Sequence, residues 1–356
     1  MRILHINHLL DLGGSEVMML DLAREQKRAG HDVHIGSMYG EGALDGKARA
    51  LGLPVHHLDS GPSLRAQVAA LRAYLRAHPA DILHSHWGVW LPAALAAFST
   101  RTPLVHTHHA NQMRRLFPKH RVATLFTRRV VVLTPEIDEY IAKWVNVPRG
   151  KIRCIPNGID LSRLEGAQPV EIEGIPRGAT VVGMVARLSP PKDQITFIRA
   201  AKLLDAKFPH VHFVSVGDGV NRPLLEAEIG SLGASKVHLL GNRLDVPDLL
   251  RRMSIKVLAT RNEGLPISLL EAMASGCACV ATDIPPNRFT LQNGEAGVLV
   301  PGADPAALAA AIERLLTDPA ERERLAAAGK AFAETLTSER MAGAYLELYR
   351  TLVPAK

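Results

Sequence analysis

The sequence has few aromatic residues, few cysteines and no long apolar run. Phe, Trp and Tyr make up 4% of its 356 residues and no known nucleic-acid-binding motif accompanies them, so we expect no nucleic-acid partner. Cys154, Cys277 and Cys279 have neither an even count nor the spacing of a zinc site, and we expect them to be reduced core residues. Because no window approaches about eighteen uninterrupted apolar residues, we expect no membrane-spanning helix.

The N-terminal residues also lack the features of a secretory leader. In MRILHINHLLDLGGSE, His, Asn and Asp interrupt the apolar residues, and no positively charged region precedes a continuous apolar stretch. The composition, with 47% hydrophobic and 22% charged residues, allows a buried core, and the length allows two domains of ordinary size. We therefore expect a soluble, globular protein of the cytoplasm.

The net charge of +7 comes from the first half of the chain. Residues 1–168 contain 21 Lys and Arg against 14 Asp and Glu, whereas the remainder contains 21 of each. Much of the excess falls in residues 111–129, where basic residues alternate with Met, Leu, Phe and Val. Such a segment can lie on the anionic inner face of a cell membrane, or it can be a solvated basic helix that packs its apolar side on its own domain. The sequence leaves both interpretations open.

Both halves of the chain alternate strand-like runs with amphipathic helices, as in a parallel sheet covered by helices. The first half contains RILHIN, DVHIGSM, DILHSH, LVHTHH and VVVLT, and the second contains TVVGMVARL, VHFVSVGDG, KVHLLG, IKVLAT and CVATD. Residues 161–179, rich in Gly, Pro and acids, are predicted to be the linker. The pattern predicts an α/β protein with doubly wound domains at 1–165 and 166–339 and a ligand cleft between their strand ends. A helix at about 340–356 could pack back on the first domain.

Residues 261–283, RNEGLPISLLEAMASGCACVATD, join a strand to a helix. Pro266 suits the first helical position, so we expect the helix to begin near Leu265 with its free backbone N–H groups open to an anion. Glu263 lies in the preceding turn, whereas Glu271 lies more than a turn into the helix, where a buried carboxylate needs a hydrogen-bond donor. The spacing alone also fits a turn residue and a helix-surface charge.

Several motifs together resemble the retaining glycosyltransferases of family 4, which share the GT-B architecture of two Rossmann-like domains facing each other. The segment 261–283 resembles the paired-glutamate signature of that family and is the most specific of these motifs. GMVARLSPPKD at 183–193 resembles the segment that opens the second domain, and IPNGID at 155–160 resembles the turn that closes the first. GGSE at 13–16 resembles the glycine loop near the N-terminus. The resemblance covers nearly the whole chain.

The resemblance implies a nucleoside-diphosphate sugar as the donor substrate. Glu271 is implied to bind the nucleotide ribose, and Glu263 to approach hydroxyls of the donor sugar. Arg187 and Lys192 are implied to hold the diphosphate, because fixed cations can stabilise the charge that develops on the leaving group. No D-x-D pair occurs, which fits a site without metal, and no cofactor is implied. The implied donor-binding residues are Gly13, Gly14, Arg187, Lys192, Gly264, Leu265 and Glu271.

A histidine of the first domain is implied to contact the transferred sugar. His109 in PLVHTHHA aligns best with the histidine of the family, and it joins Arg187, Lys192 and Glu263 as an implied catalytic residue. The period of the strand makes His106 and His108 strand residues, but a register shift of one residue would change which histidine faces the site. The sequence therefore leaves the choice among the three open.

Other residues of the first domain are candidates for the acceptor side. Gly13 and Gly14 either allow a ligand to approach the backbone or form a tight loop, and Glu16 either caps the next helix or holds that loop. His86 in HSHWG, at the end of a strand, could meet the acceptor. Its pairing with His84 also suggests zinc, but no third ligand is evident in the sequence and we expect no metal.

One position departs from the pattern of the family. After Asp283 the family commonly continues with G-G-x-x-E, whereas this chain reads IPPNRF and places Phe289 where the glutamate is expected. The acid of the family motif borders the donor site. The change therefore bears on donor identity more than on activity.

The sequence thus predicts a hexosyltransferase of glycan biosynthesis, such as that of a polysaccharide or lipopolysaccharide. It would transfer sugar from a nucleoside-diphosphate donor to a hydroxyl of a lipid-linked or cell-surface glycan, with retention of configuration. Two alternatives stay open, namely a soluble sucrose- or trehalose-type synthase and a non-catalytic subunit that binds sugar nucleotides. The basic segment 111–129 argues mildly against the soluble synthase. The non-catalytic subunit is disfavoured by the joint presence of four charged donor-site residues, Arg187, Lys192, Glu263 and Glu271.

Overall fold

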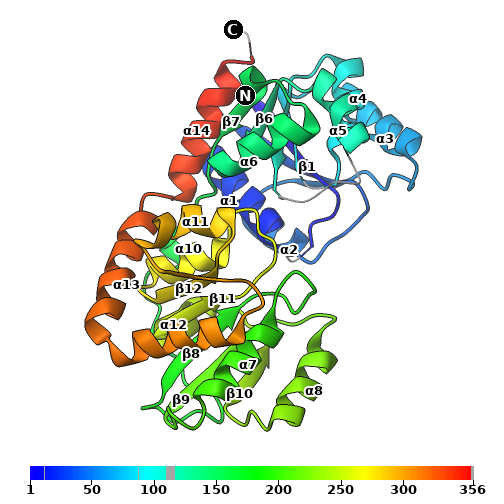
Figure 1. Cartoon of the computed structure of the whole chain (residues 1–356). Coiled ribbons are helices and arrows are strands. Elements are labelled where there is room, and N and C mark those ends of the chain that lie inside the picture. The colour runs from blue at the N-terminus through cyan, green and yellow to red at the C-terminus, as the bar shows by residue number, and fades with distance from the viewer. Residues whose placement is uncertain (12, 87, 110–116, 354–356) are drawn as a thin grey trace. The chain divides into compact units, whose positions relative to one another are not determined.

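The computed structural model describes residues 1–11, 13–86, 88–109 and 117–353, which fold into two compact units (Figure 1). Unit 1 comprises Met1–Ile159 together with Leu336–Lys356, and unit 2 comprises Asp160–Thr335. The chain therefore enters unit 2 at Asp160 and returns to unit 1 at Leu336, whereas the sequence placed these limits at 166 and about 340. At this double crossing, Ile159 forms a parallel bridge with Thr337.

Unit 1 contains a seven-stranded parallel sheet in the order β3-β2-β1-β4-β5-β6-β7. Its strands are β1 (Arg2–Asn7), β2 (Asp32–Ser37), β3 (Val55–His57), β4 (Ile82–Ser85), β5 (Leu104–His108), β6 (Arg129–Val132) and β7 (Ile152–Cys154). Its described helices are α1 (Gly14–Arg28), α2 (Asp45–Ala50), α3 (Leu64–Ala77), α4 (Trp90–Thr100), α5 (Phe117–Phe126), α6 (Pro135–Tyr140) and α14 (Ser338–Arg350), with short turns at Ile141–Val145 and Arg149–Lys151. The central strands are buried along their length, as expected where helices cover both faces of a parallel sheet.

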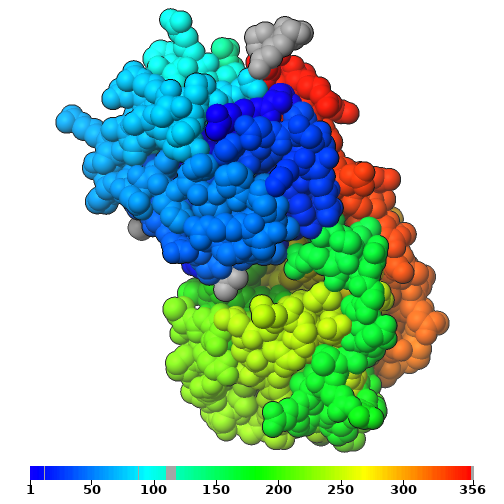
Figure 2. Space-filling view, turned by 180° about the vertical axis from the view of Figure 1, so that it is seen from behind, coloured from blue at the N-terminus to red at the C-terminus, as the bar shows by residue number. Residues whose placement is uncertain are grey.

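One part of the unit 1 core lies between the sheet and the helices α1 and α14. Ile3 and Val105 of the sheet pack in one cluster with Met19 of α1 and with Tyr345 and Tyr349 of α14. The helix α14 thus belongs to the N-terminal unit, and Figures 1 and 2 show it in red beside the blue N-terminal residues.

Unit 2 repeats this architecture with a six-stranded parallel sheet in the order β10-β9-β8-β11-β12-β13. Its strands are β8 (Thr180–Val185), β9 (Val211–Val216), β10 (Val237–Gly241), β11 (Ile255–Leu258), β12 (Ala278–Thr282) and β13 (Val298–Val300). Its helices are α7 (Gln194–Leu204), α8 (Arg222–Leu232), α9 (Val246–Arg252), α10 (Ile267–Ala274), α11 (Pro285–Thr290), α12 (Pro305–Thr317) and α13 (Pro319–Ala333), with short turns at Leu161–Arg163 and Gln292–Gly294. Aspartate side chains cap α7, α12 and α13 by accepting backbone N–H groups of the first turn.

The strand order reverses once in each sheet. In unit 1 the reversal lies between β1 and β4, and in unit 2 it lies between β8 and β11. In open α/β sheets, ligands bind outside the carboxyl ends of the strands at such a reversal. The α/β fold with two Rossmann-like domains is confirmed.

The segment predicted as a linker is wrong in position, because residues 161–179 lie within unit 2. Ile172 and Ile175 are buried there, and the backbone N–H of Gln168 donates to Asp248 at 2.8 Å. The Gly and Pro residues therefore belong to an irregular segment that packs on the rest of unit 2. The chain passes from unit 1 to unit 2 just before this segment, at Asp160.

Two further expectations are tested by burial and helix length. Cys277 and Cys279 are buried, but Cys154 is exposed on the edge strand β7, so its prediction as a core residue is wrong. No helix among the described residues has both the length and the apolar character needed to cross a membrane.

Candidate functional site

Most of the donor-side residues predicted from the sequence lie in unit 2, after two adjacent strands, whereas Gly13 and Gly14 lie in unit 1. Arg187 and Lys192 follow β8, and Glu263 follows β11. These two strands flank the point where the strand order of the sheet reverses. The sequence therefore brings its candidate cations and one candidate carboxylate to the edge where open α/β sheets bind ligands.

Lys192 and Glu263 form an ion pair between the two loops. The Lys192 ammonium donates a hydrogen bond to Oε1 of Glu263, and the two side chains are 21% and 11% exposed. Lys192 also forms an antiparallel bridge with Thr260, and the N–H of Arg261 donates to the carbonyl of Pro191 at 2.8 Å. Because the backbones of the two loops are tied together, the pair is held in place before any ligand binds.

The backbone around Arg187 is fixed from two sides. Nε2 of Gln194 donates to the Arg187 carbonyl at 2.9 Å. A glycine loop follows β9, and a Cβ on its Gly217 or Gly219 would lie 2.3 Å from the carbonyl oxygen of Ala186 or Leu188, respectively. The two glycines thus allow the loop to pack directly against the residues on either side of Arg187, whose side chain is exposed.

Glu271, for which the sequence led us to expect a hydrogen-bond donor, forms an ion pair with a cation of the same unit. Its side chain is 16% exposed, and its Oε1 lies 3.6 Å from Nη1 of Arg163. Sequence reasoning missed Arg163 because that residue lies in the segment taken for a linker. A ribose diol offers two hydroxyl donors of the kind that a partly exposed carboxylate can accept.

The helix after Glu263 begins slightly later than predicted. α10 starts at Ile267, and Pro266 is the capping residue with extended backbone angles, φ −76° and ψ 97°. Gly264 is half-buried and the side chain of Leu265 is only 5% exposed. These two residues can therefore offer a ligand their backbone, whereas the Leu265 side chain belongs to the core.

Phe289, the position that departs from the family pattern, carries an aromatic contact in place of a carboxylate. It lies on α11, and its ring meets that of Phe332 edge to face at 6.0 Å. Nearby, Asp283 pairs with Arg288 at 2.5 and 3.0 Å, and this hydrogen bonding lowers the pKa of the Asp283 carboxyl. The loop after β12 thus keeps one carboxylate, which is already paired with a cation.

In unit 1 the glycine loop leads directly into α1. Gly13 is the capping residue of that helix and Gly14 its first residue, and a Cβ added to Gly14 would meet no atom within 4 Å. Glu16 is 8% exposed and accepts hydrogen bonds from the Asn7 amide at 3.1 Å and the Ser15 hydroxyl at 2.7 Å. Glu16 therefore links the first turn of α1 to Asn7 at the end of β1, and within the part of the chain that the structure describes no side chain caps this helix.

The histidines of β5 and the loop after it divide between the two faces of the sheet. His106 lies face to face with the Trp90 ring of α4, with ring centroids 4.2 Å apart. Thr107, one residue on, contacts Tyr345 of α14 at 2.8 Å. His109 shares the face of Thr107, since its Nε2 lies 3.1 Å from Nδ1 of His86.

A cavity of about 280 Å³ opens beside these histidines, entirely within unit 1. Apolar side chains of Leu64, Trp90 and Pro92 form part of its wall, together with the polar groups of His109 and Lys119. A cavity with an apolar wall and a few polar groups can bind an organic molecule that carries hydroxyl or anionic groups.

The expectation that His86 meets the acceptor needs correction. His86 is fully buried, and its two ring nitrogens contact His5 at 3.0 Å and His109 at 3.1 Å. Among the described residues, His86 reaches the cavity through its contact with His109, which lines it. His5, which lies 81 residues away on β1, could not be identified from the sequence pattern.

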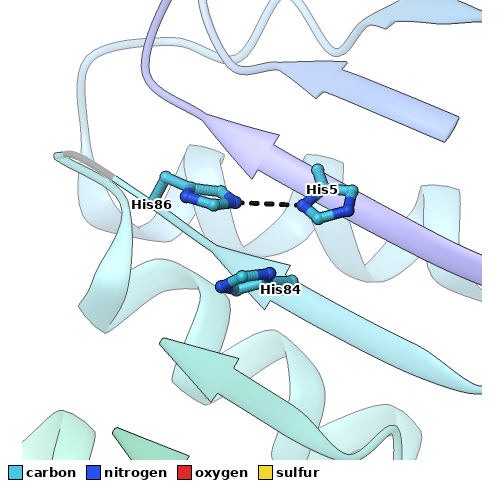
Figure 3. A group of neighbouring side chains, drawn as sticks. All are labelled: His5, His84 and His86. Carbon is cyan, nitrogen blue, oxygen red and sulfur yellow. Dashed lines mark hydrogen bonds between the residues drawn. The ribbon is translucent and has the colours of Figure 1, made fainter. Parts of the chain in front are cut away.

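His5, His84 and His86 form a buried cluster, shown in Figure 3, in which one ligand atom from each lies within 4.8 Å of the others. A third histidine is thus present where the sequence showed only two. The described structure, however, gives both nitrogens of His84 a protein partner, because Nδ1 contacts the Tyr349 hydroxyl at 2.6 Å and Nε2 contacts Thr107 at 2.7 Å. A metal ion would have to displace these contacts.

Comparison with known proteins agrees with the two-unit architecture. Residues 12–163 match the description Glycosyltransferase Family 4, and residues 169–332 match Glycosyl transferases group 1. A UDP-Gal:alpha-D-GlcNAc-diphosphoundecaprenol alpha-1,3-galactosyltransferase of Escherichia coli is 30% identical over 251 residues, 65% of each chain. A D-inositol 3-phosphate glycosyltransferase of Streptomyces avermitilis is 25% identical over 97% of this chain and 84% of its own.

A solved structure of Anabaena HepE in complex with UDP superposes with a TM-score of 0.86, at 22% identity, over 99% of this chain and 100% of that one. The fold is therefore that of the GT-B glycosyltransferases. With one match in each half, the chain belongs to the group 1 glycosyltransferases, and it is a transferase enzyme.

Proposed function

We propose that this glycosyltransferase moves a hexose-type sugar, with retention and without a metal ion, from a nucleoside-diphosphate sugar to a hydroxyl of a lipid-linked or cell-surface glycan. The observation that carries the proposal is the ion pair of Lys192 and Glu263 beside the Arg187 loop in unit 2. When the diphosphate leaves, negative charge develops on its oxygens, and preplaced cations stabilise that charge without reorganisation. When the diphosphate binds Lys192 in place of Glu263, the Glu263 carboxylate can accept a hydrogen bond from a hydroxyl of the donor sugar.

The proposed chemistry needs no nucleophile from the protein. The acceptor hydroxyl attacks the anomeric carbon from the side of the leaving group and passes its proton to the β-phosphate of the donor. Arg187, Lys192 and the backbone at Gly264 and Leu265 stabilise the departing diphosphate. His109, on the wall of the unit 1 cavity, contacts the transferred sugar.

The acceptor class rests on the relatives and on the surface of unit 1. The Escherichia coli relative has a polyprenyl-diphosphate sugar in its name, whereas the Streptomyces relative has inositol phosphate. The described surface of unit 1 supports the former, because α4 and α5 expose apolar side chains at Phe98 (65%), Val122 (43%) and Leu125 (71%). Lys119, Arg121 and Arg128 are exposed in the same region of the chain. Apolar and basic side chains together suit an anionic membrane surface.

The predicted basic segment 111–129 lies partly outside the described residues, which begin again at residue 117. Arg114 and Arg115 fall in the part that is not described. The proposal of peripheral membrane contact, on the cytoplasmic face, therefore rests on α5 and its neighbour α4.

The direct test of function uses full-length protein, EDTA and a panel of UDP-, GDP- and ADP-hexoses, with a polyprenyl-diphosphate-linked N-acetylhexosamine as the acceptor. We expect one donor to give a glycosylated lipid whose new linkage keeps the anomeric configuration of the donor, read by NMR coupling constants. An inverted linkage, or a reaction abolished by EDTA and restored by Mg²⁺, would contradict the proposed mechanism.

The test of membrane contact compares Leu125→Asp with Leu244→Asp in sedimentation with vesicles of phosphatidylglycerol and phosphatidylcholine. Leu244 is fully exposed in unit 2 and serves as the matched control. We expect the first variant to lose binding and the second to bind as the wild type does. Equal binding of all three proteins would exclude α5 from the membrane surface.

A further inference from the structure

A row of hydrogen-bonded side chains runs through the interior of unit 1 and ends at His109. Oε1 of Gln26 lies 2.7 Å from Nε2 of His5, and Nδ1 of His5 lies 3.0 Å from Nε2 of His86. Nδ1 of His86 then lies 3.1 Å from Nε2 of His109. Figure 3 shows the contact between His5 and His86 at the centre of this row. His109 is also the one member of the row that lines the cavity among the described residues.

The register of the sheet explains why these residues meet. His5 of β1 lies directly opposite His84 of β4, and His86 is two residues beyond His84, so all three share one face. Gln26 reaches the same face from α1, a helix that packs in the core beneath it. The row is thus built from four segments, namely α1, β1 and the residues just after β4 and β5, which meet beside the reversal of strand order.

Each imidazole in the row is neutral at ordinary pH. Burial lowers the pKa of His5 to about 4, holds that of His86 well below its usual value and, together with the neighbouring His108, lowers that of His109 to about 3. A neutral imidazole has one N–H donor and one acceptor nitrogen. A contact between two neutral imidazoles therefore contains one N–H donor and one acceptor nitrogen. Because each ring donates at one nitrogen and accepts at the other, the donor assignment of one ring fixes that of the next.

Gln26 sets that direction. Its Oε1 can only accept, so Nε2 of His5 donates and Nδ1 of His5 must accept from Nε2 of His86. Nδ1 of His86 must then accept from Nε2 of His109. The remaining nitrogen of His109, Nδ1, carries a lone pair.

A side branch supports this orientation of the Gln26 amide. Its Nε2 lies 3.5 Å from the Tyr349 hydroxyl, which lies 2.6 Å from Nδ1 of His84. Burial raises the pKa of Tyr349 well above its usual value, so the hydroxyl keeps its proton and can donate it to His84. The oxygen of Tyr349 is then free to accept from the amide, which leaves Oε1 of Gln26 for His5.

We propose that Gln26, His5 and His86 are positioning residues that hold His109 in the tautomer protonated on Nε2, so that Nδ1 accepts a hydrogen bond from a hydroxyl of the bound sugar. This inference rests on the proposed function, since it assumes that His109 contacts the transferred sugar. It assigns a role in specificity, because an acceptor nitrogen favours a sugar that presents a hydroxyl at that position over a deoxy sugar.

The tautomer can be read directly by NMR of the full-length protein with ¹⁵N-labelled histidine, with His109→Asn used to assign the signals. We expect the Nδ1 signal of His109 to have the shift of an unprotonated nitrogen and Nε2 that of a protonated one. The reverse pattern would overturn the proposal, and so would one equivalent of tightly bound zinc in metal analysis. This measurement needs no activity, so it stands or fails separately from the proposed function.

Variants of His86 test the consequence for the reaction. A glutamine can donate from its amide nitrogen and accept at its oxygen, so His86→Gln can preserve the direction of the row, whereas His86→Leu breaks it. We expect His86→Leu to lower kcat about tenfold, the effect of one hydrogen bond, with little change in KM for the donor, and His86→Gln to restore most of it. His56→Leu is the matched control, because His56 pairs with His34 at 2.9 Å on the same sheet but outside the row.

Thermal melts of all three variants accompany the kinetics. If His86→Leu and His86→Gln lose kcat equally while their melting temperatures match that of the control, the direction of the row has no role and the proposal is wrong. If all variants keep the kcat of the wild type, the proposed role of the row is also wrong, although the proposed transferase reaction would stand.

Discussion

Lys256 is fully buried in β11, next to the donor-side loops of unit 2. Its ammonium donates to the carbonyl of the next residue, Val257, at 3.1 Å. Burial lowers the pKa of Lys256 to about 8 because the charged form loses its hydration, while the neighbouring Cys279 opposes this shift. Lys256 therefore lowers the free energy of unfolding at any pH at which its side chain is charged in the folded protein.

We predict that Lys256→Met stabilises the protein by up to about 3 kcal/mol at pH 7, the equivalent of the pKa shift. The gain should shrink as the pH rises from about 8 toward 10.5, because the unfolded chain there holds a proton that the folded Lys256 has released. Chemical denaturation of both proteins at several pH values gives the difference in free energy of unfolding. A difference that stays constant over this range would contradict the prediction, because it would show that folding does not lower the pKa of Lys256.

At the scale of elements, the glycine loop after β9 decides where Arg187 lies. Gly219 has a φ of +156°, and a Cβ there would overlap the Leu188 carbonyl at 2.3 Å. The N–H of Leu188 also donates to the carbonyl of Asp218 at 3.0 Å, so the two loops are joined as one unit. A displacement of the glycine loop must therefore move the backbone beside Arg187.

We predict that Gly219→Ala destabilises unit 2 by about 1–3 kcal/mol and weakens donor binding about tenfold or more. Gly230→Ala is the matched control, since Gly230 lies inside α8 and an added Cβ would meet no atom within 4 Å. The measurements are thermal melts and titration with the nucleotide sugar that the protein uses. Normal binding by Gly219→Ala would mean that the two loops move independently.

Much of the element order could be predicted from the sequence, because the strands of both sheets are short apolar runs between amphipathic helices. The edge strands β3 and β7 of unit 1 and β13 of unit 2 were missed, since each has only three residues and gives no clear period. The linker was misplaced because Gly and Pro mark irregular backbone, which occurs in a packed covering as well as in a joint between domains.

The candidate site also contains residues that could be predicted from the sequence and residues that could not. Glu263 and Lys192 were identified within short motifs, and their contact across 71 residues follows from the adjacency of β8 and β11. The partners Arg163 and His5 were not identified, because they come from segments without a motif. Their roles depend on which strands and loops become neighbours in the folded protein, and a local sequence pattern does not contain that information.

At the scale of the whole molecule, the two units should differ in their response to acid. The interior of unit 1 holds several neutral histidines whose pKa values are lowered by burial, namely His5, His84, His86, His106 and His109. The described histidines of unit 2 with lowered pKa values, His212 and His238, lie in less buried positions. An unfolded histidine binds a proton below about pH 6.5, whereas these folded ones resist it.

We therefore predict that unit 1 loses stability as the pH falls from 6.5 toward 4 and that unit 2 loses less. For His5 alone the loss at pH 5 is about 2 kcal/mol. Hydrogen exchange of β1, β4 and β5 against β8 and β9, corrected for intrinsic rates, measures this difference. Equal loss of protection in the two units at pH 5 would contradict the prediction.

The central claim is that Arg187 and Lys192 hold the diphosphate of the donor. Calorimetric titration of the full-length protein with UDP, GDP and ADP tests it most directly, together with Arg187→Ala and Lys192→Ala. Lys202→Ala is the control, because Lys202 lies on α7, 40% exposed, and pairs with Asp205 away from the Arg187 and Lys192 loops. We predict that at least one nucleotide binds the wild type and the control equally and binds both site variants about tenfold or more weakly. Binding that is unchanged in both site variants, or no binding of any nucleotide, would contradict the account.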